Sequence, residues 1–106
     1  MKRLMIVGGL RDGVHDEAEA LLREGPPFEP AQVGLERHSA YLTAREVIFV
    51  FEADEVEWIV NDLIDDPSVA PFFGPWQKLI EDTPRLAHER FHWDRNEEKF
   101  GVGLGV

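Results

Sequence analysis

The stretch VIFVF, residues 47–51, decides the fold, because its five consecutive apolar residues are β-branched or aromatic. Side chains along a strand point alternately to the two faces of its sheet, so a strand of this composition carries apolar side chains on both faces. An antiparallel sheet with helices on one side and water on the other would show alternation here. We therefore expect both faces of the strand at 47–51 to be covered.

The residues before this strand predict its hairpin partner. Residues 33–42 alternate loosely, and only a short turn at Thr43-Ala44-Arg45 separates them from residues 47–51. We expect the two segments to pair as a hairpin. The alternation along the first of them places the following side chains on one face: Leu35, Arg37, Ser39 and Tyr41, with Glu36, His38, Ala40 and Leu42 on the other.

Two amphipathic patterns predict helices on either side of the hairpin. The first helix is expected to begin at an Asp12 cap and to end at Gly25-Pro26-Pro27. The second is expected over residues 54–65, where Asp54 and Glu57 have the spacing of a capping box. Apolar residues recur at helical spacing in both segments: Val14, Ala18, Leu21 and Leu22, then Val56, Ile59, Val60 and Leu63.

The remaining segments complete the pattern. The short apolar run at residues 4–7 predicts a first strand, and residues 75–81 predict a short extra helix. Residues 89–94 alternate around Phe91 and Trp93, which predicts a fourth strand before a glycine-rich tail at 101–106. The order is βαββαβ, which predicts a single α+β domain over residues 1–106 with a ferredoxin-like, four-stranded antiparallel sheet.

Both helices of such a unit lie on one face of the sheet and leave the other bare. About half of the side chains at 47–51 then face outward, and at about 25 cal/mol per Å² this exposure costs several kcal/mol. A second copy of the chain is the simplest cover, since a two-fold dimer needs only one self-complementary patch. We therefore expect a homodimer.

Composition excludes several classes of partner and site. The 106-residue chain has a formal net charge of -10 and a pI near 4.7, which disfavour binding to nucleic acid or to anionic lipid. No run of about 18 apolar residues and no signal-peptide pattern is present, so we expect a cytoplasmic protein without membrane contact. The absence of cysteine excludes disulfides, thiolate catalysis and cysteine-based metal sites.

Across residues 3–95 the pattern resembles the dimeric α+β barrel superfamily, which includes antibiotic biosynthesis monooxygenase-like and stress-responsive α/β-barrel domains. The resemblance rests on these segments: the strand at 47–51, the helix at 54–65, the break at Asp66-Pro67-Ser68-Val69, the turn at Phe72-Phe73-Gly74-Pro75-Trp76, and the closing strand through Phe91 and Trp93. It implies a pocket between sheet and helices for a small aromatic, polyketide, sugar or haem-like ligand.

The same resemblance implies a range of activities, among them cofactor-independent oxygenases, isomerases and decarboxylases, so the fold alone does not choose the chemistry. Haem-degrading members carry an Asn on the first strand, where this chain has Val7-Gly8-Gly9. We therefore expect no cofactor. The ligand expected is a small aromatic or polyketide-like molecule.

Five residues are candidates for the site. His38 and His92 lie on predicted strands and are candidate catalytic residues, because imidazole titrates near neutral pH. Arg90 has the same strand parity as His92 and is a candidate for holding an anionic oxygen, while Tyr41 and Trp76 are candidate ligand contacts. His88 and His92 would lie about 13 Å apart along a strand, so no shared metal is expected.

Each candidate also has an ordinary structural explanation. A strand histidine can face solvent, and Trp76 can simply pack in the core. Trp58 and Trp93 are expected to lie in the core or at an interface. Two functions therefore stay open. One is a small-molecule-binding or small-molecule-transforming dimer, such as a cofactor-independent oxygenase or isomerase. The other is a non-catalytic, stress-related or interaction domain whose barrel is filled with side chains.

Overall fold

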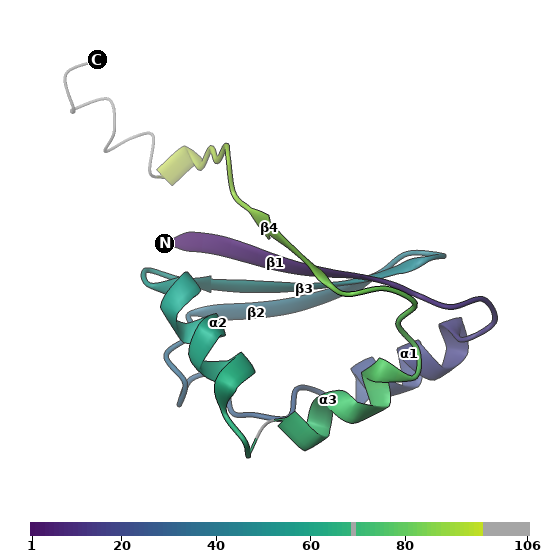
Figure 1. The fold of residues 1–106 in the computed structure, drawn as a ribbon. Helices are drawn as coiled ribbons and strands as arrows, with labels where there is room; N and C mark the ends of the chain where they lie inside the picture. The colour runs from purple at the N-terminus through teal and green to yellow at the C-terminus, as the bar shows by residue number, and fades with distance from the viewer. Residues whose placement is uncertain (69, 97–106) are drawn as a thin grey trace.

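The computed structural model describes residues 1–68 and 70–96, and the expected glycine-rich tail at 101–106 lies outside them. Four strands form one sheet in the order β2-β3-β1-β4, with every neighbouring pair antiparallel (Figure 1). The elements are β1 (Lys2–Gly9), α1 (His15–Arg23), β2 (Arg37–Leu42), β3 (Glu46–Ala53), α2 (Val56–Asp65), α3 (Ala70–Gln77) and β4 (Arg85–His88). This strand order confirms the predicted ferredoxin-like α+β fold.

The helices all lie on one side of the sheet, as Figure 1 shows. We call that side the helix face and the opposite side the outer face. The register aligns one residue from each strand in a row across the helix face: Ala40, Phe49, Ile6 and Leu86. By the same alternation, the outer face carries Arg3, Met5 and Val7 of β1, Arg37, Ser39 and Tyr41 of β2, Glu46, Ile48, Val50 and Glu52 of β3, and Arg85 and Ala87 of β4.

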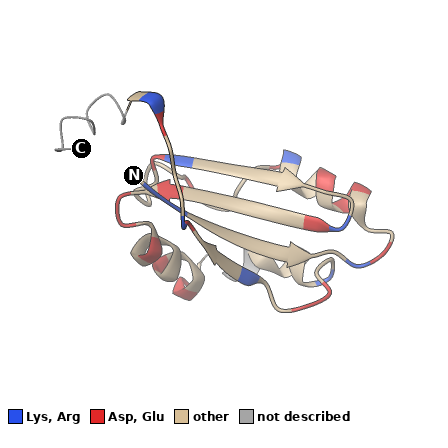
Figure 2. Ribbon diagram, turned by 90° about the horizontal axis from the view of Figure 1, so that it is seen from above, with Lys and Arg blue, Asp and Glu red and all other residues tan. Residues whose placement is uncertain are grey.

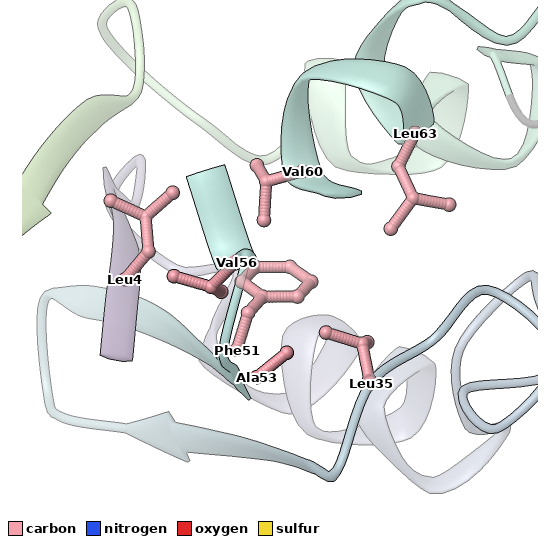
Figure 3. Close-up of a cluster of buried hydrophobic side chains, with 7 residues drawn as sticks. All are labelled: Leu4, Leu35, Phe51, Ala53, Val56, Val60 and Leu63. Carbon is pink, nitrogen blue, oxygen red and sulfur yellow. The ribbon is translucent and has the colours of Figure 1, made fainter. Parts of the chain in front are cut away.

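The core is split into two clusters that leave space between them. One cluster packs α2 on β1 and β3, and Figure 3 shows its members: Leu4, Leu35, Phe51, Ala53, Val56, Val60 and Leu63. The other joins Ala18 of α1 to Val47 and to Leu10 and Leu79. Val47, Val56 and Val60 are almost completely buried, and burial of each such side chain contributes about 1.5–3 kcal/mol.

The predicted fourth strand at 89–94 is wrong. The last strand of the sheet is Arg85–His88, which pairs with Leu4–Val7 of β1. Continuing the register would set Glu89 and Arg90 against Arg3 and Lys2, where β1 begins, so later residues have no strand beside them. Phe91 and Trp93, whose alternation suggested the strand, are 84% and 56% exposed and do not lie in the core.

The second strand is shorter than predicted at its beginning. It starts at Arg37 and not at residue 33, because residues 29–35 form turns in which the Leu35 amide donates to the Pro30 carbonyl at 3.0 Å. Gly34 has a φ of 96°, which glycine adopts readily and which interrupts extended backbone.

The predicted helix caps are also wrong. The residues before the first turns of α1 and α2 are Val14 and Glu55, and neither helix has a side-chain cap. Asp54 instead lies 3.3 Å from the amino group of Met1, and Trp58 on α2 is 67% exposed, so it is not a core residue. The extra helix is Ala70–Gln77, displaced toward the N-terminus from the predicted 75–81, with Pro75 inside it.

Within the part of the chain that the structure describes, every helix is too short or too polar to cross a membrane.

Candidate functional site

A cavity of about 840 Å³ lies between the helix face of the sheet and the helices. Its floor includes the row of four residues contributed by the four strands, and Leu21, Leu22, Ile64 and Trp76 reach it from the helices. The volume is within the range of small-molecule sites, which is about 300–1,000 Å³. The floor is long as well as apolar, since three gaps between strands of about 4.8 Å span about 14 Å. The cavity therefore suits an extended apolar ligand.

Trp76 forms part of the cavity wall because it packs edge-on against the floor. Its ring lies 5.4 Å from that of Phe49, with an interplanar angle of 88°. This geometry is a favoured one for aromatic pairs and fixes the indole in place. Trp76, a predicted ligand contact, lines the cavity and also packs against the sheet.

Gly8 affects the shape of the cavity because it has no side chain. A Cβ placed on it would lie 2.9 Å from Cδ1 of Ile80, closer than two carbons normally approach. Ile80, in the segment between α3 and β4, can therefore lie over the end of β1 and close that side of the cavity. Gly8 was expected only as the end of the first strand.

His38 is the histidine that lines the cavity within the described residues. It lies on the helix face of β2, opposite Phe51, and its ring stacks on that of Phe51 at 4.7 Å and contacts the ring of Phe28 at 5.5 Å. Its Nδ1 lies 2.9 Å from the carbonyl oxygen of Val50. A carbonyl only accepts hydrogen bonds, so Nδ1 carries the proton and Nε2 of the neutral ring is left as an acceptor.

Burial among aromatic rings lowers the pKa of His38, because it penalises the charged ring, while the hydrogen bond to the carbonyl of Val50 works in the opposite direction. Desolvation is the larger effect. His38 is therefore neutral at physiological pH, and a neutral imidazole with a fixed tautomer can accept a proton through Nε2.

The other polar groups at the cavity are few. Gln77, Asp82 and Thr83 line it near the beginning of β4. His38 lies on one edge strand of the sheet and β4 is the other edge strand. The site thus has polar groups at its two ends and apolar groups between them, an arrangement that orients a ligand along its length.

Tyr41, Arg90 and His92 do not line this cavity. Tyr41 lies on the outer face of β2 and is 58% exposed. Arg90 and His92 follow β4, and Nδ1 of His92 lies 2.7 Å from Nη1 of Arg3 on the outer face. The structure therefore brings His38 and Trp76 to one cavity and separates the other three candidates from it.

Possible metal ligands are sparse in the described residues. His15, Asp16 and Glu19 on α1 bring their ligand atoms within 4.8 Å of one another, but all three side chains are exposed. His88, the other histidine considered for a metal, has Nδ1 3.0 Å from Oε1 of Glu57. Exposed groups of this kind are common without any ion, so they define no metal centre.

Sequence reasoning missed two parts of the site, Phe28 and the segment at 80–84. Phe28 follows two prolines in a loop, and nothing in its local pattern says that its ring meets His38. Residues 80 and 81 of the other segment fall within the predicted helix at 75–81, which gives them no role at the cavity. One signal was available, since a neighbour that fills the space over a strand glycine is a common reason for that glycine.

The comparisons with known proteins agree with this fold. No protein-family model matches the chain, and no curated protein matches it. Among solved structures, tetracenomycin F2 cyclase from Streptomyces glaucescens, a type-II polyketide cyclase, superposes with a TM-score of 0.68 and 13% identity over 89% of this chain and 98% of the cyclase.

Two further structures are similar. An antibiotic biosynthesis monooxygenase has a TM-score of 0.64 and 10% identity over 87% of this chain and 99% of its own. Rv0793 from Mycobacterium tuberculosis has a TM-score of 0.60 and 10% identity over 88% and 96% of the two chains. The chain therefore shares the ferredoxin-like α+β fold of these three structures.

Proposed function

We propose that this protein binds a small, extended apolar molecule in the cavity between sheet and helices and transforms it with His38 as the proton acceptor. The observation that carries the proposal is the position of a neutral imidazole, with its tautomer fixed by the Val50 carbonyl, in the wall of an apolar cavity of about 840 Å³.

The chemistry proposed is proton abstraction from an acidic C–H or O–H of the ligand by Nε2 of His38. A carbonyl-activated C–H or a phenolic O–H suits such a base, because positioned imidazoles are common general bases near neutral pH. This step begins both isomerisations and cofactor-independent oxidations. Trp76 supplies a flat wall for an aromatic ligand. Tyr41, Arg90 and His92 have no part in this reaction as we propose it.

The similar structures support this class of ligand. One is a type-II polyketide cyclase and another an antibiotic biosynthesis monooxygenase, so the same fold serves reactions of small organic molecules elsewhere. At 10–13% identity, these comparisons bring no reaction to this chain. The cavity between sheet and helices favours this proposal over the alternative of a non-catalytic interaction domain.

We also propose that the protein is a homodimer joined through the outer face. The middle of that face is apolar, with Met5, Val7, Ile48, Val50 and Tyr41, and Met5 and Tyr41 are 37% and 58% exposed. Its charged side chains lie toward the ends of the strands. There Arg3 and Arg37 pair with Glu52, and Arg85 pairs with Glu46. An apolar centre with a polar rim is the usual composition of an interface.

A thermal-shift screen tests the ligand proposal. The panel contains aromatic acids, quinones, polycyclic phenols and the neutral apolar dye Nile red. A ligand of the cavity raises the melting temperature of the parent protein, because binding to the folded state stabilises it. The matched control is Ala40→Trp, which fills the cavity from its floor without touching the outer face. If no compound distinguishes the parent from Ala40→Trp, the cavity is not a ligand site.

A further inference from the structure

The lining of the cavity contains a single acidic side chain among the described residues, that of Asp82. No lysine or arginine of the described residues lines the cavity, and His38, the histidine in its wall, is neutral at physiological pH. An anionic group carried into such a cavity loses its hydration without gaining a cation as partner, which is costly. The cavity therefore suits ligands that are neutral or positively charged.

The charge around the cavity has the same sign. The helices α1 and α2, which lie on the helix face, carry six acidic residues and one arginine between them. Figure 2 shows acidic positions in red along both helices, and the chain as a whole has a formal net charge of -10. Charges of one sign around a concave site attract ligands of the opposite sign and repel those of the same sign. Cations are therefore drawn to this side of the sheet.

Asp82 is available to contact a ligand directly. It lies between α3 and β4 in an exposed position, and within the described parts of the chain its carboxylate has no hydrogen-bond or ion-pair partner. The basic residue that follows it, Arg85, lies on the outer face and pairs with Glu46 at 3.0 Å. A carboxylate accepts hydrogen bonds and donates none, so the ligand group that meets Asp82 is a donor.

Asp82 and His38 lie at opposite ends of the cavity. The amide of Glu81 donates to the carbonyl of Gly9 at 2.8 Å, so Asp82 follows a residue bonded to the end of β1. His38 aligns across the sheet with Leu4, near the beginning of β1. Five residues along β1 at ~3.3 Å each and two gaps between strands of ~4.8 Å separate these positions by roughly 15–20 Å. A ligand that reaches both side chains is elongated.

We propose, on the basis of the proposed function, that the ligand of this cavity carries an amine at the end held by Asp82, away from the end at which His38 acts. Such a molecule is elongated and apolar in its middle, with an ammonium group at one end and the acidic C–H or O–H at the other. The ammonium donates to the carboxylate of Asp82 and keeps part of its contact with water, because that position is exposed.

Three biphenyls that differ in one para substituent test the preference for charge: aminomethyl, hydroxymethyl and carboxylate. Their dissociation constants at neutral pH are measured by isothermal titration calorimetry. The amine is expected to bind the parent protein about five- to tenfold more tightly than the alcohol, as a charge-assisted hydrogen bond at a partly exposed site allows. The carboxylate is expected to bind most weakly. A carboxylate that binds as tightly as the amine would overturn the proposal.

Asp82→Asn tests which residue is responsible. The variant is expected to reduce the advantage of the amine over the alcohol to less than about twofold, while the alcohol binds as it does to the parent. Asp82 is exposed and outside the helices and strands, so the substitution should leave the fold intact. Asp62→Asn removes the same charge from an exposed position of α2 outside the lining and should keep the preference. A preference that persists in Asp82→Asn overturns the role of Asp82.

Ala40→Trp separates this proposal from the ligand site itself. Because the indole fills the floor of the cavity, the variant is expected to bind all three biphenyls more weakly than the parent does. If the parent binds none of them more tightly than Ala40→Trp, the cavity is not a ligand site and both proposals fail. If the parent binds them more tightly than Ala40→Trp but without any advantage for the amine, the proposal of an amine ligand alone is overturned.

Discussion

The imidazole of His38 donates from Nδ1 to the backbone carbonyl of Val50 at 2.9 Å, although the two residues lie on different strands. The bond holds the ring between Phe28 and Phe51 and leaves Nε2 with its lone pair. The neutral ring of His38 therefore has a fixed tautomer and orientation before any ligand binds, as the proposed base requires.

His38 should make the folded protein sensitive to acid. Its pKa is lowered in the folded state by burial, so the unfolded chain takes up a proton first as the pH falls through the ordinary histidine value of 6.5. The free energy of unfolding should therefore decrease from pH 7.5 toward pH 5, relative to the non-titrating variant His38→Phe. Urea unfolding at several pH values measures the free energy of unfolding of both proteins. The other histidines are present in both, so their effect cancels in the difference. Parallel pH profiles would contradict the prediction.

Replacing the base should separate binding from turnover. With a substrate from the ligand screen, His38→Gln should lower kcat by about 10²–10⁴-fold, since an amide cannot accept the proton, while KM changes by less than about tenfold. Steady-state kinetics measure both. Thr43→Ala, at the hairpin away from the cavity lining, is the control and should behave as the parent. Unchanged kcat in His38→Gln would remove His38 from the reaction.

Gly8 and Gly9 should respond in opposite ways to alanine. In Gly8→Ala the new methyl meets Ile80 at 2.9 Å, and the displaced side chain should cost about 1 kcal/mol of unfolding free energy. A Cβ on Gly9 meets nothing within 4 Å and its φ lies outside the left-handed region, so Gly9→Ala should be neutral or stabilise by up to about 1 kcal/mol. Chemical denaturation of both variants decides this, and equal effects would show that Ile80 does not lie over Gly8.

Glu52 and Glu46 should differ as ion-pair partners. Glu52 is buried between Arg3 and Arg37, so Glu52→Gln removes the buried counter-charge of both guanidinium groups, leaves Arg3 only its pair with the less buried Glu89, and should cost about 1–3 kcal/mol. Glu46 pairs with Arg85 at 3.0 Å in a largely exposed position, and Glu46→Gln should cost less than about 1 kcal/mol. Thermal unfolding in low and high salt checks both. The opposite order of stability would contradict the burial of the Glu52 pair.

Strong periodic signals predicted the architecture correctly. The run at 47–51, the helix face of Val56, Val60 and Leu63 and the alternation along Arg37–Leu42 all describe residues that pack against the sheet or along it. Each of these patterns reflects which side of a single segment is buried, so it can be recognised without knowing which other segments pack against it. The predicted position of His38 on the face opposite Tyr41 followed from the same alternation and is confirmed.

The errors have a different origin, since they concern contacts between distant segments. Alternation at 89–94 resembled a strand, but the partner strand begins at Lys2 and cannot extend to meet it. Asp54 had the position of a cap, but its carboxylate meets the amino group of Met1. His92 was placed beside the ligand, although Arg3 holds it on the other face. No local sequence pattern indicates which distant residue will pair with a given side chain.

The strict alternation of β2 has an evolutionary consequence. Ala40 faces the cavity while its neighbours Ser39 and Tyr41 point to the opposite side of the sheet. In the proposed ligand-binding dimer, enlarging residue 40 would change which molecules fit the cavity, and changing residue 41 would alter how subunits associate, with neither substitution disturbing the other trait. A single edge strand can thus diversify substrate choice and quaternary structure independently, one residue apart.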